Sequence, residues 1–263
     1  MDLGLDGDAA LVAASSSGLG RATARAFAAE GANVVINGRD RSRLEATADA
    51  LRETVAGDVH PVAADLTDSA AVEALVAETV DAFGGLDHLV TNAGGPPGGP
   101  FLETSDADWW DAYELLVASA MRLCRHAGPH LHEDGGGTVT AITSLAVKEP
   151  AEGLVLSNAV RSSVIGLVKT LAREWAPAVR ANVVMPGTHD TERIEDLAES
   201  MVEGGEFEDR ESAVAAWLED VPLGRMGDPD RFGEVVAFLA GEPAGFVNGT
   251  ALVVDGGEAR SVL

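Results

Sequence analysis

Several residue types are scarce in this sequence of 263 residues, and each shortage excludes something. Cys124 is the one cysteine, so no disulfide can form within the chain, and a reducing compartment is the expected setting. No stretch reaches the roughly 18 uninterrupted apolar residues that a membrane-spanning helix needs. The N-terminus has no basic region ahead of an apolar run. We therefore expect a cytoplasmic protein that is neither exported nor held in a membrane.

Basic residues are scarce too: 18 Lys and Arg stand against 43 Asp and Glu, which gives a formal net charge of −25. Lys148 and Lys169 are the only lysines. Because the acidic residues are spread over all the expected surface helices, we interpret this as the acidic surface of a halophile's protein, in which salt screens the self-repulsion. An ordinary acidic protein is the alternative. Nucleic acid is disfavoured as a partner, since a phosphate backbone needs a basic face.

Apolar runs alternate with helical segments along the whole chain. We expect strands at 9–14, 33–37, 59–64, 86–91, 138–143, 180–184 and 249–255. Helices are expected from the first glycine-rich turn to about residue 30, then at 41–55, 68–83 and 105–125, through 157–171, and from 228 onward. This alternation predicts an α/β fold with a parallel sheet covered by helices on both faces.

The hydrophobic content of 46% is sufficient for a sizeable core, and neither an internal repeat nor a linker is found. We therefore expect residues 1–263 to form one domain. The acidic, helical stretch at about 190–220 has the character of a lid-like insertion over a substrate site.

A strand, a glycine-rich turn and a helix begin the chain, which is the arrangement that binds a dinucleotide. Glycines let the backbone approach a pyrophosphate, and the N-terminus of the helix directs unpaired N–H groups at it. A tight turn without a ligand is the alternative. The residues expected to contact the cofactor here are Ala14, Ser15, Ser17, Gly18, Leu19 and Gly20.

The ends of the next strands carry further candidates. Gly38 and Arg39 follow the second strand; an NAD site would have a carboxylate there, whereas a 2′-phosphate requires an arginine and no acid. We therefore expect NADP(H), with NAD(H) possible. Asp65 and Leu66 end the third strand, where the carboxylate can accept a hydrogen bond from an adenine amino group. After the fourth strand come the small residues Asn92, Ala93 and Gly94, which leave room for a ring or a ribose.

The stretch 140–174 combines a strand, a loop and a long helix. Ser144 stands where the strand stops, and Ser157 and Arg161 lie one helical turn apart on one face. These side chains could form a reaction site, or a strand terminus beside an ordinary helix face. His126, His130 and His132 are loosely spaced, and no acid or cysteine completes a ligand set, so we expect no metal site.

The sequence resembles the short-chain dehydrogenase/reductase family over nearly its whole length. The motifs that carry this resemblance are 15–21, Asp65-Leu66, Asn92-Ala93-Gly94, Ser144, 182–187 with Thr191, and 253–257. The segments 221–229 and 247–249 are similar to the 3-oxoacyl-acyl-carrier-protein reductase branch. The resemblance implies a Rossmann-type, doubly wound sheet of about seven strands, a nicotinamide cofactor, and a homodimer or homotetramer. It adds Pro186, Gly187, Thr188 and Thr191 to the expected cofactor contacts.

The chain departs from the family pattern where the chemistry occurs. Of the family's catalytic serine, tyrosine, lysine and asparagine, only the serine is kept, as Ser144. The alignment puts Ser157 at the tyrosine position, Arg161 at the lysine position and Val117 at the asparagine position. Tyr113 is the only tyrosine, so no Tyr-x-x-x-Lys motif exists. The family's leading glycine is Ala14, which crowds the turn slightly. These departures suggest an atypical subgroup.

Serine is a far weaker acid than a phenol, and arginine does not readily release a proton, so the proton donor must be sought elsewhere. We take Lys148 as the first candidate and His189 as the second; a solvated loop charge and a lid-surface residue are the alternatives. Arg161 can still hold the nicotinamide ribose or an anionic group.

Three functions follow, and the first is favoured. It is an NADP(H)-dependent oxidoreductase, similar to 3-oxoacyl reductases, in which Ser144 polarises the carbonyl of a small-molecule substrate. The second is a nucleotide-binding regulatory or structural protein without catalysis. The third is a cofactor-independent lyase of the halohydrin dehalogenase kind, which keeps the tyrosine and loses the glycine turn, the reverse of this sequence.

Overall fold

In a computed structural model, which describes residues 1–133, 135–205 and 207–262, the strands form one seven-stranded sheet in the order β3-β2-β1-β4-β5-β6-β7. Every neighbouring pair is parallel. The strands are β1 Ala9–Val12, β2 Asn33–Gly38, β3 Val59–Ala63, β4 His88–Thr91, β5 Gly137–Ile142, β6 Val179–Pro186 and β7 Ala251–Val254. The predicted doubly wound parallel sheet is confirmed, with strand ends within a few residues of those expected.

Side chains of the central strand β1 alternate between two cores, as the period of two residues in a strand requires. Leu11 and Ala13 belong to the core on one face, and Ala10 and Val12 to the core on the other. Both faces of the strands are therefore apolar, which is typical of a buried parallel sheet.

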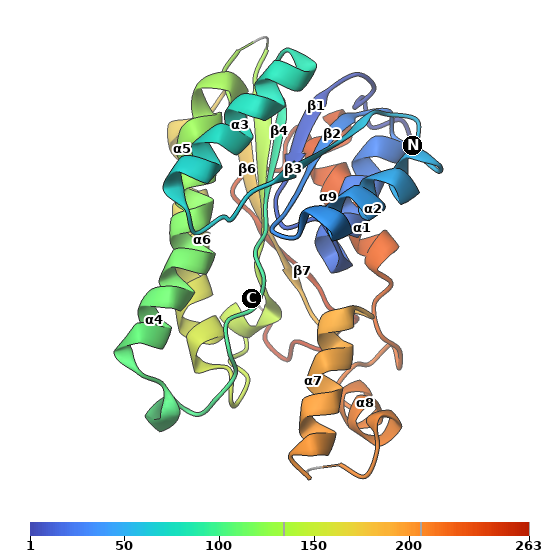
Figure 1. The fold of residues 1–263 in the computed structure, drawn as a ribbon, viewed down its shortest axis with the longest axis vertical. Coiled ribbons are helices and arrows are strands. Elements are labelled where there is room, and N and C mark those ends of the chain that lie inside the picture. Colours follow the sequence, from blue (N-terminus) through green and yellow to red (C-terminus); the bar gives the residue numbers. More distant parts are fainter. Residues whose placement is uncertain (134, 206, 263) are drawn as a thin grey trace.

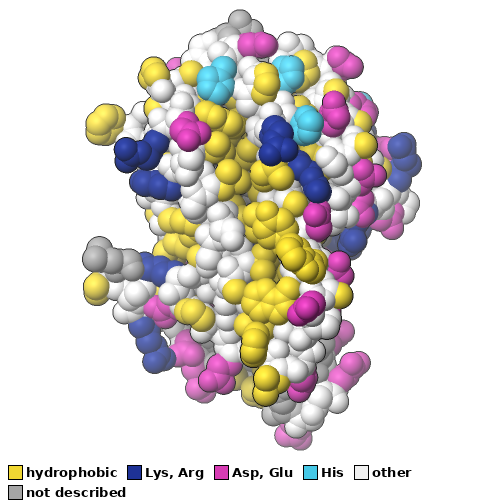
Figure 2. All heavy atoms as spheres, turned by 90° about the vertical axis from the view of Figure 1, so that its left-hand side faces the viewer, with side chains coloured by type: hydrophobic (Ala, Val, Ile, Leu, Met, Phe, Trp, Pro, Cys, Tyr) yellow, Lys and Arg dark blue, Asp and Glu magenta, His cyan; other side chains and the backbone are white. Residues whose placement is uncertain are grey.

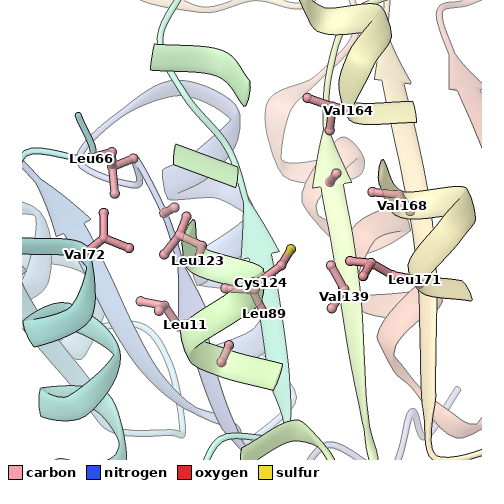
Figure 3. Packing of buried hydrophobic residues seen from close by; sticks show 14 of the residues in the cluster. Leu11, Leu66, Val72, Leu89, Leu123, Cys124, Val139, Val164, Val168 and Leu171 are labelled. Carbon is pink, nitrogen blue, oxygen red and sulfur yellow. The ribbon is translucent and has the colours of Figure 1, made fainter. Parts of the chain in front are cut away.

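Helices cover both faces of the sheet (Figure 1). One layer holds α3 Ser69–Phe83, α4 Asp106–Tyr113, α5 Ser119–Leu131 and α6 Val155–Glu174. The other holds α1 Gly18–Ala29, α2 Arg41–Arg52 and α9 Pro229–Ala240. Figure 3 shows the first core, in which Val72 and Leu123 pack with Leu11 and Leu89 of the sheet. Cys124 lies in this core, where burial raises the pKa of its thiol to about 12, so it is unreactive.

Side-chain caps stand at the expected starts of two helices, residues 68 and 228. At the start of α3, the Asp68 side chain accepts from the backbone N–H groups of Ala70 and Ala71. At the start of α9, the Asp228 side chain accepts from the backbone N–H of Asp230, and Pro229 is the first residue of the helix. Gly84 ends α3 in the left-handed conformation, with φ at 83°.

The helix expected at 105–125 differs in two ways. It is divided by a π-helical turn, η2 Glu114–Ala118, and it continues through Pro129 to Leu131. Proline removes one hydrogen bond of the helix, but the spacing of Leu123, Ala127 and Leu131 keeps an apolar face buried against the sheet. Burial of this face outweighs the lost bond.

The acidic stretch 190–220 forms two short helices, α7 Glu192–Glu203 and α8 Arg210–Leu218. They project beyond the sheet at the end opposite the chain's N-terminus (Figure 1). The remaining elements are the short turns η1 Phe101–Glu103, η3 Leu145–Val147 and η4 Glu242–Ala244.

Candidate active site

The strand order reverses at β1, whose neighbours are β2 and β4. In doubly wound sheets the carboxyl ends of the strands open a crevice at this reversal. Here a cleft of about 580 Å³ lies there, bounded by the ends of β1 to β6 and by α7. Most of the predicted site residues line it: Ala14, Ser17, Gly18, Leu19, Gly20, Arg39, Asp65, Leu66, Asn92, Ala93, Gly94, Ser144, Ser157, Arg161, Pro186, Gly187 and Thr191.

The first turn brings the backbone of α1 close to β1. A Cβ atom added at Gly20 would lie 2.3 Å from the carbonyl oxygen of Ala14, so no side chain fits at this position. Ala14 takes a φ of 47°, in the left-handed region that favours glycine. The N-cap residue Ser17 makes no side-chain cap, which leaves the first N–H groups of α1 available to an anion.

Ser15 has a structural role in this turn. It is fully buried, its hydroxyl donates to Val12 O at 2.6 Å, and it accepts from Asn37 N–H at 2.9 Å. Ser16, which sequence reasoning passed over, lines the cleft instead. Asn37 joins three strand ends, because its side chain accepts from Ala14 N–H and donates to Val62 and Ala64 carbonyls.

Two arginines line the end of the cleft beside β2 and β3. Arg39 is exposed and lies close enough to Asp65 to help lower the pKa of that carboxyl, although hydrogen bonds from Thr67 are the larger cause. Arg43 on α2, which sequence reasoning did not select, forms an ion pair with Glu192 at the start of α7. This pair joins the two sides of the cleft.

Ser144 is the N-cap of η3, at the end of β5. Its Oγ accepts from Ala146 N–H at 3.2 Å, so the hydroxyl hydrogen remains available for donation to a ligand. The prediction that this serine stands at a strand end is confirmed.

Ser157 and Arg161 lie one turn apart on α6 and touch each other. Arg161 Nε donates to Ser157 Oγ at 3.1 Å, and Nη2 donates to Gly94 O at 3.1 Å. Arg161 is only 9% exposed, because it lies on the part of α6 where Val160 and Val164 also pack into the core. Burial, and secondarily the charge of Arg193, lower the pKa of Arg161 to about 10, so it stays charged at neutral pH.

The bulged helix η2 borders the inner side of Arg161. Leu116, together with Ser119 of α5 and Arg161, lines a second cavity of about 10 Å³. Val117, at the position where the resemblance expects asparagine, is buried in the core. A π-helical turn at such a position is frequent in functional sites.

Three predicted residues lie outside the lining of the cleft. Ser15 is buried beneath it, Thr188 bonds through its backbone N–H to Glu258 at 2.9 Å, and Lys148 ends η3. Tyr113, the only tyrosine, is 41% exposed on α4 and packs against Trp110, with ring centroids 6.2 Å apart.

His189 lines the cleft but faces away from a reacting centre. It is 5% exposed, and its ring meets Phe232 edge to face, with centroids 5.1 Å apart. Nδ1 donates to the Gly187 carbonyl at 3.0 Å, so Nε2 carries no proton in the neutral ring. Nε2 lies against Gly227, since a Cβ added there would be 2.6 Å away. Burial lowers the pKa of His189, so its ring is uncharged near neutral pH and is a poor proton donor.

Among the described residues, no group of three or more His, Cys, Asp or Glu side chains could hold a metal ion. In the same part of the chain, every helix is too short or too polar to cross a bilayer.

Comparisons with known proteins agree with the geometry. The family model described as enoyl-(acyl carrier protein) reductase matches residues 13–258. An uncharacterized oxidoreductase of Mycobacterium tuberculosis is 33% identical over 96% of this chain and 92% of its own. A 3-oxoacyl-[acyl-carrier-protein] reductase of Thermotoga maritima is 29% identical over 96% of this chain and 98% of its own. The L-sorbose reductase of Gluconobacter frateurii, solved with NADPH and L-sorbose, superposes with a TM-score of 0.94 at 32% identity, covering 100% of both chains.

The buried ring of His189 predicts sensitivity to acid. Its folded-state pKa lies below the value of about 6.5 in an unfolded chain, so the unfolded state binds the proton more readily. The stability contributed at this site is complete above pH 6.5 and falls as the pH drops below it. The variant His189→Asn keeps an amide N–H but does not titrate. Thermal unfolding is measured at pH 7.5 and pH 5.5, roughly one unit either side of the unfolded-state pKa of histidine. Between these two pH values the variant should lose less stability than the wild type. His126→Asn, on α5, serves as the control and should behave as the wild type; an equal loss in His189→Asn would contradict the interpretation.

Proposed function

Since the chain belongs to the short-chain dehydrogenase/reductase family, we propose that it is an NADP(H)-dependent oxidoreductase that interconverts a carbonyl and an alcohol. The observation that carries the proposal is the cleft at the strand-order reversal, where a glycine turn, an arginine and two serine hydroxyls meet. The bound NADPH of the L-sorbose reductase supports a nicotinamide cofactor in this fold.

The residues present fit such a cofactor. Gly20 lets α1 pack closely on the end of β1, and the uncapped N–H groups at the start of α1 can bind a diphosphate. Asp65 accepts from Thr67 through Oδ1, so its other oxygen can accept from an adenine amino group. Arg39 and Arg43 both line the cleft, and a guanidinium at the end of β2 would favour a 2′-phosphate. When bound, the nicotinamide supplies or accepts the hydride.

The two serines act on the oxygen of the reacting carbonyl. Each hydroxyl accepts one hydrogen bond, Ser144 from Ala146 and Ser157 from Arg161, so each keeps its own hydrogen available for donation to a ligand. Two such donors, with a buried cation behind one of them, stabilise negative charge as it develops on the substrate oxygen. Donors that are fixed in advance need no reorganisation during the reaction.

Ser157 is also the proton donor in this proposal. A free serine hydroxyl is too weak an acid for this role, which is why the sequence pointed elsewhere. In the structure the Arg161 guanidinium donates to Ser157 Oγ, and its positive charge stabilises this oxygen as the proton leaves for the alkoxide oxygen; water then restores the serine hydroxyl. The reverse steps apply to oxidation. Neither earlier candidate supports this role as well, because Lys148 lies outside the lining and His189 directs Nε2 at Gly227.

A nucleotide-binding protein without catalysis is the competing function. Such a protein would bind NADPH in the same cleft. This function does not explain why two serine hydroxyls are held with their hydrogens free to donate. Relatives that carry oxidoreductase names favour the enzyme.

The setting and the moving parts belong to the same proposal. We place the enzyme in the cytoplasm of an organism that lives in salt, as its single buried cysteine and net charge of −25 favour. Residues 1–263 act as one domain, in which α7 and α8 form the lid, since Thr191, Glu192 and Arg193 at its base line the cleft.

Self-association is proposed through the helical face that carries α4. Trp110 and Tyr113 on α4 and Phe101 and Leu102 on η1 are exposed, and Figure 2 shows a band of hydrophobic side chains down this side of the molecule. Exposed aromatic and aliphatic side chains of this size mark contact surfaces. A second copy is the simplest partner, because a two-fold contact covers the same patch on both chains.

The first prediction concerns the cofactor. Arg39→Ala should raise the dissociation constant of NADPH by roughly 10- to 100-fold, because a charged hydrogen bond to phosphate is lost, and should leave that of NADH unchanged. Fluorescence titration at one fixed salt concentration measures both. Arg41→Ala, on an exposed neighbour paired with Glu45, is the matched control. An unchanged preference for NADPH in Arg39→Ala would remove Arg39 from the site.

The second concerns catalysis. Ser157→Ala should lower kcat by roughly 10²- to 10⁴-fold with NADPH binding preserved, because the acid is lost and the cofactor contacts are not. Ser163→Ala, an exposed serine on the same helix, is the control and should keep full activity. Steady-state rates over a panel of ketones and alcohols in molar salt test this. Full activity in Ser157→Ala would refute the assignment, and no turnover by the wild type would favour the competing function.

The third concerns assembly. Light scattering should give a molar mass that is two or four times the 27.0 kDa of one chain. Trp110→Glu should shift this mass toward the monomer, because it places a charge in the contact. Glu203→Gln, an exposed acid on α7, is the control. A monomeric wild type would contradict the proposal.

A further inference from the structure

The base of α7 directs a second arginine toward Arg161. The guanidinium of Arg193 packs on Gly95, where an added Cβ would lie 3.2 Å from Nη2 and 3.4 Å from Nε. The preceding residue, Gly94, accepts from Arg161 Nη2 through its carbonyl at 3.1 Å. Two consecutive glycines after β4 thus contact both guanidinium groups, and Arg161 and Arg193 line the same cleft.

Among the described residues, neither arginine has an acidic partner. The hydrogen-bond acceptors of Arg161 are a hydroxyl and a carbonyl, both neutral. Across residues 1–133, 135–205 and 207–262, no Asp or Glu oxygen lies within 4.0 Å of Arg161 or Arg193 nitrogens. By contrast, Arg43 and Arg210 pair with acids of the same helix α7.

This arrangement is unexpected in a chain with 43 acidic and 18 basic residues. Two like charges that face each other repel, and the repulsion is stronger where water is excluded. The charge of Arg193 acts on Arg161 across the cleft and opposes its protonation. A bound anion would remove this repulsion and would be held by two guanidinium groups, which suit a carboxylate better than any other side chain does.

We propose that Arg193 and Arg161 bind a carboxylate of the substrate, so that the enzyme acts on short oxo acids and hydroxy acids. This inference rests on the proposed oxidoreductase function and names its substrate class. The carboxylate lies close to Ser157, which shares a hydrogen bond with Arg161, so only a short chain separates it from the reacting carbonyl.

The position of Arg193 favours the substrate over a phosphate of the cofactor. Thr191 faces the glycine turn, since its Cγ2 lies 3.8 Å from a Cβ placed on Gly18. Two residues later, Arg193 faces Gly95, at the end of β4 and beside Arg161. The extra charge therefore lies on the side of Arg161, which holds Ser157, and away from the glycine turn.

Acetoacetate and its methyl ester provide a direct test, because they differ in the charge that the two arginines would bind. Both are titrated calorimetrically into the enzyme loaded with NADP⁺, which has no hydride to give, so binding is measured without turnover. Chloride is held constant, since it competes for the same charges. We expect the acid to bind about 10-fold or more tightly than the ester, the effect of one charged hydrogen-bonded pair.

The variant Arg193→Gln should abolish this preference for the acid and leave the affinity for NADP⁺ unchanged. Arg225→Gln removes the same charge from an exposed site outside the cleft, where the side chain donates to the Met226 carbonyl, and should keep the preference. Kinetic measurements should agree with the binding data. In Arg193→Gln the KM for the acid should rise, so that the ratio of kcat/KM for the acid to kcat/KM for the ester falls.

Two results would overturn the proposal. One is a wild-type enzyme that binds ester and acid equally. The other is an Arg193→Gln variant that binds NADP⁺ more weakly and keeps its preference for the acid, which would make Arg193 a contact of the cofactor phosphates. Failure of the proposed oxidoreductase function would give a different result. In that case no carbonyl compound would be reduced, but the acid could still bind tightly, with or without NADP⁺.

Discussion

The burial of one positive charge, that of Arg161, fixes the geometry of the cleft. Removing a cation from water costs several kcal/mol unless its hydrogen bonds are satisfied, and here the partners are the neutral Ser157 Oγ and Gly94 O. These bonds tie α6 to the end of β4. The serine is held by the arginine, and the backbone of Gly94 cannot move without leaving a buried guanidinium unsatisfied. The interaction between Ser157 and Arg161 therefore holds the cleft together and is also the basis of the proposed chemistry.

The resemblance puts Ser157 and Arg161 at the family's tyrosine and lysine positions, and a guanidinium there can bind other groups than an ammonium does. A lysine nitrogen is a compact donor, whereas a guanidinium has five N–H groups in one plane and can serve a hydroxyl, a carbonyl and an anion together. Arg39, Arg43, Arg161 and Arg193 all line the cleft, against two acids, Asp65 and Glu192. On a chain with a net charge of −25, this is a local reversal of sign that draws anionic ligands to one place.

Most of the fold could be predicted from the sequence, because its signals are local. The glycine turn, the apolar runs and the caps at Asp68 and Asp228 each depend on a few neighbouring residues. The continuation of α5 through Pro129 could not, because burial of Leu131 against the sheet decides it. In the site, Ser144, Ser157 and Arg161 follow from alignment with a family. Arg43 and Arg193 could not be predicted, because only the folding of α7 over the strand ends brings them together at the cleft. The one available signal was that Arg193 is a basic residue in an acidic segment.

A crystal structure with bound NADP⁺ is the most direct measurement of the central claim, that Arg161 and the two serines form the reacting end of a dinucleotide site. The account predicts that the 2′-phosphate contacts Arg39, that the diphosphate lies on the N-terminus of α1, and that the nicotinamide lies beside Ser144 and Ser157. A cofactor bound in the opposite direction, or a nicotinamide out of reach of both hydroxyls, would contradict it.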